Sequence, residues 1–270
     1  MTKVIVAGAG GRMGRRICAM VQQHSGLTLS GAFEQADSPF VGKDIGETVG
    51  FGPIGVTIAD SLEAVIEQGE VIIDFTFHKA TMEFIKVAAQ YGRAIVIGTT
   101  GLTAENLVVL RETAAAHFPC VQAPNMAVGV NVLFKLAERT AAVLGDAYDV
   151  EIVEAHHRMK KDAPSGTALK LGEMAAAGLG RNLAEVGVYE RHGMIGERTD
   201  KEIGIQTIRA GDIVGEHTVY FAGAGERIEI THRASNRDNF ANGAALAAAW
   251  VADKPKGLYS MFDVLGLNDF

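Results

Sequence analysis

The start of the chain carries the pattern that most limits its fold: a strand, a tight glycine-rich turn and a helix in direct succession. Residues 3–7 are mostly β-branched, residues 8–14 are Gly-Ala-Gly-Gly-Arg-Met-Gly, and residues 15–24 have helical apolar spacing. This order predicts a parallel α/β sheet whose first turn binds a dinucleotide phosphate. The glycines stand at positions 8, 11 and 14, whereas the commoner G-x-G-x-x-G pattern would have its third glycine at Met13.

A second strand, residues 27–33, ends at Glu34, about twenty residues beyond the glycine turn. A carboxylate at that point accepts hydrogen bonds from the adenosine ribose hydroxyls, which favours NAD over NADP. The alternative is a tight turn that binds no phosphate, followed by a surface glutamate. Because strand, turn, helix, strand and terminal acid all agree, nucleotide binding is the better interpretation.

The rest of the first half continues the alternation of strands and helices. We expect 40–55 to be a loop beside the cofactor, and we expect Asp74, Phe75 and Thr76 at the carboxyl end of a buried strand. Asn125 either binds a carboxamide or forms a turn before the next helix. The expected strands are 71–76, 94–98 and 120–126, and the expected helices are 61–68, 79–91 and 102–117, the last with Thr103 as N-cap.

The alternation stops after a helix at 130–145, which we take as the hinge out of the first domain. Strands at 150–155, 204–209, 215–221 and 226–232 then alternate partly with period two, which predicts a sheet open on one face and a homo-oligomer built on it. A helix at 238–251 should pack back on the first domain. The predicted fold is α/β: a Rossmann-like dinucleotide-binding domain, residues 1–127 completed by 238–270, plus an α+β substrate-binding C-terminal domain, residues 128–237, with an open mixed sheet used for oligomerisation.

A basic segment at residues 156–161, His-His-Arg-Met-Lys-Lys, stands out in a chain whose formal net charge is -7. It is followed by Asp162-Ala-Pro-Ser-Gly-Thr, where Ser165, Gly166 and Thr167 open a helix whose first backbone amides suit a carboxylate or phosphate. A proton donor, a fixed positive charge and an anion-binding helix start would then lie around one turn. The alternative is a solvated basic loop, to which Arg158 and Lys161 fit best.

Composition excludes several classes of protein. The longest uncharged apolar run, 241–252, is too short to cross a bilayer, and the sequence begins with strand residues at Val4 rather than a signal peptide. Cys18 and Cys120 have neither disulfide-framework nor metal-ligand spacing, so we expect free thiols, no metal and a cytoplasmic protein. The acidic balance and the lack of a basic stripe argue against nucleic acid.

Four motifs together resemble those of the 4-hydroxy-tetrahydrodipicolinate reductase (dihydrodipicolinate reductase) family. They are Gly8-Ala-Gly-Gly-Arg-Met-Gly14, Gly98-Thr-Thr-Gly101, Ala123-Pro-Asn-Met126 and, most specific, Glu154-Ala-His-His-Arg-Met-Lys-Lys-Asp-Ala-Pro-Ser-Gly-Thr-Ala168. The resemblance covers the whole chain in order. It implies a homotetramer that uses NADH or NADPH to reduce a small cyclic imine with two carboxylates, 4-hydroxy-tetrahydrodipicolinate, with loss of water, in the diaminopimelate route to lysine.

Position by position, the resemblance implies catalytic proton transfer by His156 and Lys160, and substrate contacts at His157, Gly166 and Thr167, to which the helix start adds Ser165. It also implies that the nucleotide contacts are Gly8, Ala9, Gly10, Gly11, Arg12, Met13, Glu34, Gly98, Thr99, Thr100, Ala123, Pro124, Asn125 and Met126.

Two positions depart from the family pattern. Gln35 stands where many members have an arginine that can bind a 2′-phosphate, so NADH is favoured, although Arg12 could still reach a phosphate. Met126 replaces a common phenylalanine, which changes packing near the nicotinamide more than chemistry. Because the substrate and the nucleotide would bind different domains, we expect closure about hinges near 125–131 and 235–239.

Two other functions are open at this stage. A different two-domain NAD-linked imine or aldehyde reductase would share the glycine turn, but it has no need of the basic segment and the Ser165-Gly-Thr helix start. A nucleotide-sensing regulatory protein would bind the nucleotide without turnover.

Overall fold

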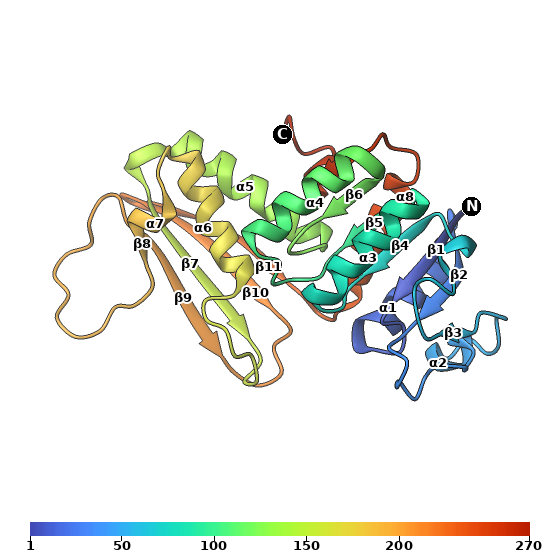
Figure 1. Cartoon of the computed structure of the whole chain (residues 1–270). Coiled ribbons are helices and arrows are strands. Elements are labelled where there is room, and N and C mark those ends of the chain that lie inside the picture. Colours follow the sequence, from blue (N-terminus) through green and yellow to red (C-terminus); the bar gives the residue numbers. More distant parts are fainter. The chain divides into compact units, whose positions relative to one another are not determined.

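The computed structural model describes residues 1–270, which form two compact units. Unit 1 comprises Met1–Val128 and Arg237–Asp269, and unit 2 comprises Gly129–Asn236 with Phe270. Figure 1 shows the elements of both units. None of the helices combines the length and the hydrophobicity that a membrane-spanning segment requires.

Unit 1 is built on a seven-stranded sheet in which every pairing is parallel, with the order β12-β6-β5-β4-β1-β2-β3. The chain order reverses between β1 and β4, which is the switch point where ligands bind in sheets of this kind. The strands are β1 (Thr2–Ala7), β2 (Leu27–Phe33), β3 (Ile58–Ala59), β4 (Val71–Asp74), β5 (Ala94–Ile97), β6 (Pro119–Gln122) and β12 (Gly257–Tyr259). The helices are α1 (Arg12–Gln23), α2 (Ile45–Val49), α3 (His78–Tyr91), α4 (Ala104–His117), α8 (Asp238–Val251) and α9 (Met261–Leu265).

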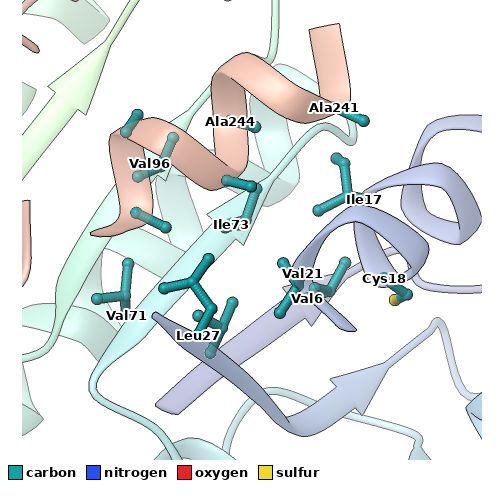
Figure 2. Packing of buried hydrophobic residues seen from close by; sticks show 14 of the residues in the cluster. Val6, Ile17, Cys18, Val21, Leu27, Val71, Ile73, Val96, Ala241 and Ala244 are labelled. Carbon is teal, nitrogen blue, oxygen red and sulfur yellow. The ribbon is translucent and has the colours of Figure 1, made fainter. Parts of the chain in front are cut away.

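The sheet of unit 1 is covered on both faces, as expected for a doubly wound fold. Alternate residues of β1 enter different cores: Val4 and Val6 pack with α1 and α8, whereas Ile5 packs with α3 and α4. Figure 2 shows the first of these cores, in which Ile17 and Val21 of α1 and Ala241 and Ala244 of α8 lie against the strands. The expected return of the 238–251 helix onto this domain is confirmed by these contacts.

Some local predictions in unit 1 were wrong. Residues 61–68 form turns and a 3-10 helix at Ile66–Gln68, because Leu62, Val65 and Ile66 reach the core without a regular helix. The expected loop at 40–55 contains α2, which Asp44 caps by accepting a hydrogen bond from Gly46 N at 2.7 Å. The same carboxylate accepts one from Gly55 N at 2.7 Å, beyond the helix. The short elements β12 and α9 were not predicted.

Unit 2 is a mixed five-stranded sheet with the order β11-β10-β7-β9-β8. β7 pairs in parallel with β9 and antiparallel with β10, and α6 covers one face of all three (Figure 1). The opposite face of β7 and β10 is only partly buried, which agrees with the predicted open sheet. The elements are α5 (Val128–Leu144), β7 (Asp149–His156), α6 (Gly166–Gly178), α7 (Leu183–Val186), β8 (Gly187–Val188), β9 (Ile203–Arg209), β10 (Glu216–Gly223) and β11 (Glu226–Arg233).

Candidate active site

In unit 1, the turn after β1 has a backbone that only glycine permits. Gly8 has φ +60, and a Cβ on Gly14 would lie 2.0 Å from the Gly8 carbonyl oxygen. The N-cap of α1 is Gly11, which provides no side-chain hydrogen bond to the first turn. The first turn of α1 therefore has backbone amides that no side-chain cap occupies, which suits an anion.

A cavity of about 550 Å³ lies in unit 1 at the carboxyl ends of β1, β2 and β4. Its volume is in the range of ordinary cofactor pockets. It therefore has the place and the size expected for part of a dinucleotide site. Its lining includes Gly8, Gly11, Glu34, Gln35, Thr76 and Phe77.

Glu34 is held at the glycine turn by its own carboxylate. Its Oε1 accepts a hydrogen bond from Gly10 N at 2.9 Å, and both Glu34 and Gln35 line the cavity. The acid is thus placed beside the turn, as ribose recognition requires. Arg12 instead lines a separate cavity of about 480 Å³ together with Arg15, Arg16 and Arg237.

The other nucleotide contacts implied by the resemblance do not line the 550 Å³ cavity. The Thr99 hydroxyl faces inward and accepts a hydrogen bond from Thr76 N at 2.9 Å, which ties the ends of β4 and β5 together. Asn125 Oδ1 accepts from Ala127 N at 2.9 Å, the turn-forming role, and the Met126 side chain is buried in the core. Gly98 lies against Phe75, where a Cβ would be 2.2 Å from the ring. Residues 100, 123 and 124 lie in the same two loops.

In unit 2, the centre of the candidate site is a buried carboxylate. Strand alternation puts Glu154 and His156 on one face of β7, and the fully buried Glu154 lies 2.6 Å from His156 Nδ1. Arg209 of β9 binds the same carboxylate through two nitrogens, at 2.7 and 2.8 Å. Burial opposes ionisation, but the hydrogen bonds from His156 and Arg209 outweigh it and lower the pKa of Glu154 to about 2.

His156 has its second ring nitrogen turned away from Glu154, toward Gly215. A Cβ at Gly215 would lie 3.1 Å from His156 Nε2, so glycine leaves room there. The side chain of His156 is 12% exposed, enough for contact with a ligand. The arrangement gives a histidine with one nitrogen fixed by the protein and one available for proton transfer.

The start of α6 lies beside this pair. Ser165 is its N-cap, as predicted, and its Oγ accepts from Ala168 N at 3.2 Å. Ser165 N donates to Glu154 at 3.1 Å, and its Oγ lies 3.1 Å from His217 Nε2. Because the hydroxyl is buried and has these partners, Ser165 positions the helix start rather than offering its side chain to a ligand. Gly166 is exposed, with open space where a Cβ would point.

A turn returns Lys160 to this region, since its backbone N donates to the His157 carbonyl at 3.0 Å. The Lys160 ammonium is 2.9 Å from a carboxylate oxygen of Asp162. The positive charge near His156 is therefore shared with an acid, which the sequence did not predict. His157 is partly buried, and Arg158 is exposed.

The structure thus brings His156, the start of α6 and the 157–160 turn together within unit 2, around residues to which no role had been given. These residues are Glu154, Arg209 and His217, which contact His156 and Ser165. The Glu154-x-His156 spacing in a strand was a usable signal for the first of them. Arg209 and His217 lie on other strands, so their approach depends on sheet register. No group of three or more histidine, cysteine or acidic side chains could hold a metal ion.

Two family models match the chain: dihydrodipicolinate reductase N-terminus at residues 2–126 and dihydrodipicolinate reductase C-terminus at residues 129–265. The chain belongs to the dihydrodipicolinate reductase family. Within this family, it is 66% identical over 269 residues to a 4-hydroxy-tetrahydrodipicolinate reductase of Desulfotalea psychrophila, with 100% of both chains covered. It is 56% identical to the one from Syntrophus aciditrophicus, over 99% of this chain and 100% of that protein.

The solved structure of a dipicolinate-bound dihydrodipicolinate reductase from Paenisporosarcina sp. TG-14 matches with a TM-score of 0.77 and 28% identity, covering 97% of this chain and 98% of that one. An amine dehydrogenase from Mycobacterium smegmatis matches with a TM-score of 0.60 at 13% identity, over 96% of this chain and 95% of that one, which shows only a shared fold. The dihydrodipicolinate reductase family assignment therefore agrees with both the predicted α/β fold and the resemblance found in the sequence.

Proposed function

We propose that the chain catalyses the NAD(P)H-dependent reduction of 4-hydroxy-tetrahydrodipicolinate to tetrahydrodipicolinate, with loss of water, in the diaminopimelate route to lysine. The observation that carries the proposal is the full-length 66% identity to a reductase of that name. Support from the structure is the combination, in unit 2, of His156 with a free nitrogen and the exposed start of α6.

The residues of unit 1 fit a dinucleotide. Gly14 lets α1 pack directly against the Gly8 carbonyl, the start of α1, which no side chain caps, suits a pyrophosphate, and Glu34 suits the ribose hydroxyls. When bound, the nicotinamide supplies the hydride. Of the contacts implied by the resemblance, Gly8, Gly11 and Glu34 have the strongest support because they line the cavity.

Unit 2 is proposed to bind the substrate. A ring with two carboxylates suits the first backbone amides of α6 at Gly166 and Thr167, together with the cationic Lys160 and the His157 ring. Ser165 contributes indirectly by holding the first turn of α6 in place. Binding a carboxylate close to Lys160 would compete with Asp162 for the ammonium.

Proton transfer is assigned to His156 and Lys160. Once water is lost, reduction of the conjugated ring places electron density on its nitrogen side, where the Lys160 ammonium stabilises the charge. His156 Nε2 then delivers a proton to the enamine carbon. The hydride and this proton together account for the two hydrogens that the ring gains.

NADH is the proposed preferred cofactor. Gln35 lines the cavity next to Glu34 and offers a 2′-phosphate no positive charge, while Glu34 would repel one. Arg12 lines another cavity of the unit and adds no positive charge to the one that holds Glu34 and Gln35, which also favours NADH over NADPH.

We further propose a homotetramer assembled through the open face of the unit 2 sheet and a hinge near 125–131 and 235–239. The unit boundaries fall in these two segments, at Val128/Gly129 and Asn236/Arg237. The open face carries half-buried Val153 and Thr218 and the 47% exposed Ile208, side chains suited to pairing with another copy. Sedimentation analysis tests the assembly: a single monomeric species at micromolar concentration would exclude it.

The activity is tested by mixing the purified protein, NADH and enzymatically generated 4-hydroxy-tetrahydrodipicolinate, and following the absorbance of the reduced cofactor. The proposal predicts substrate-dependent loss of that absorbance. Nucleotide binding without turnover, with either NADH or NADPH, would instead support a nucleotide-sensing protein.

A further inference from the structure

We propose that Glu154 is a positioning residue, whose buried carboxylate fixes the ring orientation and tautomer of His156 and also anchors the start of α6. The inference deepens the proposed function, because it takes His156 as the proton donor. One carboxylate would then set both the proton-transfer group and the anion-binding helix start.

The carboxylate of Glu154 has partners on both oxygens. Oε2 receives His156 Nδ1 at 2.6 Å and Arg209 Nη1 at 2.8 Å. Oε1 receives Arg209 Nη2 at 2.7 Å, Ser165 N at 3.1 Å and Thr207 Oγ1 at 3.2 Å. With 0% exposure, the carboxylate has no water to satisfy it, so its orientation is set by these donors.

An ionised carboxylate only accepts hydrogen bonds, and this determines the histidine tautomer. Nδ1 must carry the hydrogen that points at Glu154, which leaves Nε2 as the nitrogen that gains and loses the reactive proton. The pKa of Glu154, lowered to about 2, agrees with a carboxylate that stays ionised at neutral pH.

Arg209 supplies the positive charge that offsets the cost of burying the ionised Glu154 carboxylate. Its guanidinium faces the carboxylate with two nitrogens, and Nη2 also donates to the Asp162 carbonyl at 2.7 Å, which holds the loop before α6. An uncompensated buried carboxylate would be costly. The other titratable groups that face this region are Lys160 and Asp162 of the loop, His217 of β10 and His232 of β11.

The alternative is that Glu154 only stabilises the sheet. The chain offers a matched control on the same strand, because Glu151 also binds arginines, Arg191 at 2.7 and 2.8 Å and Arg198 at 3.0 Å, but on the opposite face of β7. A purely structural role predicts similar consequences for Glu154→Gln and Glu151→Gln.

The experiment compares these two variants with the wild-type protein in turnover, in the pH dependence of kcat and in the ring nitrogen signals of His156 by ¹⁵N NMR. An amide at position 154 can donate to Nδ1, which would favour the wrong tautomer and remove the negative charge. We expect Glu154→Gln to lower kcat roughly a hundredfold or more and to move the histidine limb of the pH profile to lower pH. The fraction of His156 in the Nε2–H tautomer should be larger in this variant than in the wild type. Glu151→Gln should leave all three unchanged.

A double-mutant cycle separates positioning from stability. In the His156→Ala background, Glu154→Gln should lower kcat by less than about threefold, because the group it positions is already missing. An equal loss in both backgrounds, with an unaltered pH profile, would overturn the proposal.

Two readouts keep the test independent of folding and of the proposed reaction. If Glu154→Gln does not fold, the wild-type NMR spectrum still decides, since a neutral His156 protonated on Nε2 rather than Nδ1 contradicts the proposal. If the wild type does not turn over the substrate, the proposed function fails, while the tautomer and its change in Glu154→Gln still test the positioning role.

Discussion

Ser165 Oγ lies 3.1 Å from His217 Nε2, and this contact joins the first turn of α6 to strand β10. His217 is buried, and burial followed by repulsion from His156 lowers its pKa to about 3. The folded protein therefore contains a neutral imidazole at this position at any pH at which the enzyme would work.

The low pKa of His217 predicts a loss of stability in mild acid. In the unfolded chain His217 binds a proton below about pH 6.5, whereas in the folded protein it does not until about pH 3. His217 therefore costs no stability above pH 6.5, and the free energy of unfolding decreases as the pH falls toward 3. At pH 5 this loss is about 2 kcal/mol. Urea unfolding of wild type and His217→Gln at pH 7 and pH 5 measures it. We expect the variant to lose less stability over this interval; parallel pH dependences would contradict the assignment.

Ser165→Ala is expected to weaken both the fold and substrate binding. Loss of the cap costs about 1 kcal/mol and releases the first turn of α6, so KM for the substrate should rise severalfold. Thr103→Ala is the matched control, since Thr103 caps α4 in unit 1 with its own capping box. It should cost similar stability without changing KM. An equal KM effect in the two variants would show that general destabilisation is responsible.

Gly166→Ala is expected to weaken substrate binding without changing the stability of the fold. A Cβ at Gly166 meets no atom within 4 Å and the backbone does not require positive φ, so the fold should tolerate alanine. The added methyl would lie at the helix start where a substrate carboxylate is proposed to bind. We expect an unchanged melting temperature and a KM raised roughly tenfold, about 1.4 kcal/mol of binding. An unchanged KM would show that the substrate carboxylate does not bind at the start of α6.

Gln35→Arg should shift the cofactor preference toward NADPH. An arginine at this position in the cavity can pair with the 2′-phosphate that Glu34 disfavours. The measurement is the ratio of kcat/KM with NADPH to that with NADH, expected to rise at least tenfold. Gln22→Arg adds the same charge on an exposed part of α1 and should leave the ratio unchanged. A shift of equal size in both variants would indicate a general charge effect.

The sequence predicted those elements of the fold that depend on residues adjacent in the chain. The helix Asp238–Val251 and the Thr103 cap were predicted correctly because apolar spacing and capping chemistry depend on adjacent residues. The helix expected at 61–68 was wrong because Leu62, Val65 and Ile66 satisfy the same apolar spacing through turns. β12 was missed because its three residues form a strand only by pairing with β6.

For the candidate site too, the residues that lie close together in the sequence could be predicted, and those that only strand pairing brings together could not. His156, Lys160 and the start of α6 lie in one continuous segment, so their proximity was predictable from the chain itself. Arg209 and His217 reach Glu154 and Ser165 across 55 and 52 residues, which only the pairing of β7 with β9 and β10 brings about.

The central claim is that His156 in unit 2 transfers a proton while unit 1 alone holds the nucleotide. Its most direct test measures kcat and the NADH dissociation constant of His156→Ala beside the wild type. We predict that kcat falls roughly a hundredfold to ten-thousandfold while the dissociation constant changes by less than about twofold. An unchanged kcat, or a loss of NADH affinity as large as the loss of turnover, would contradict the account.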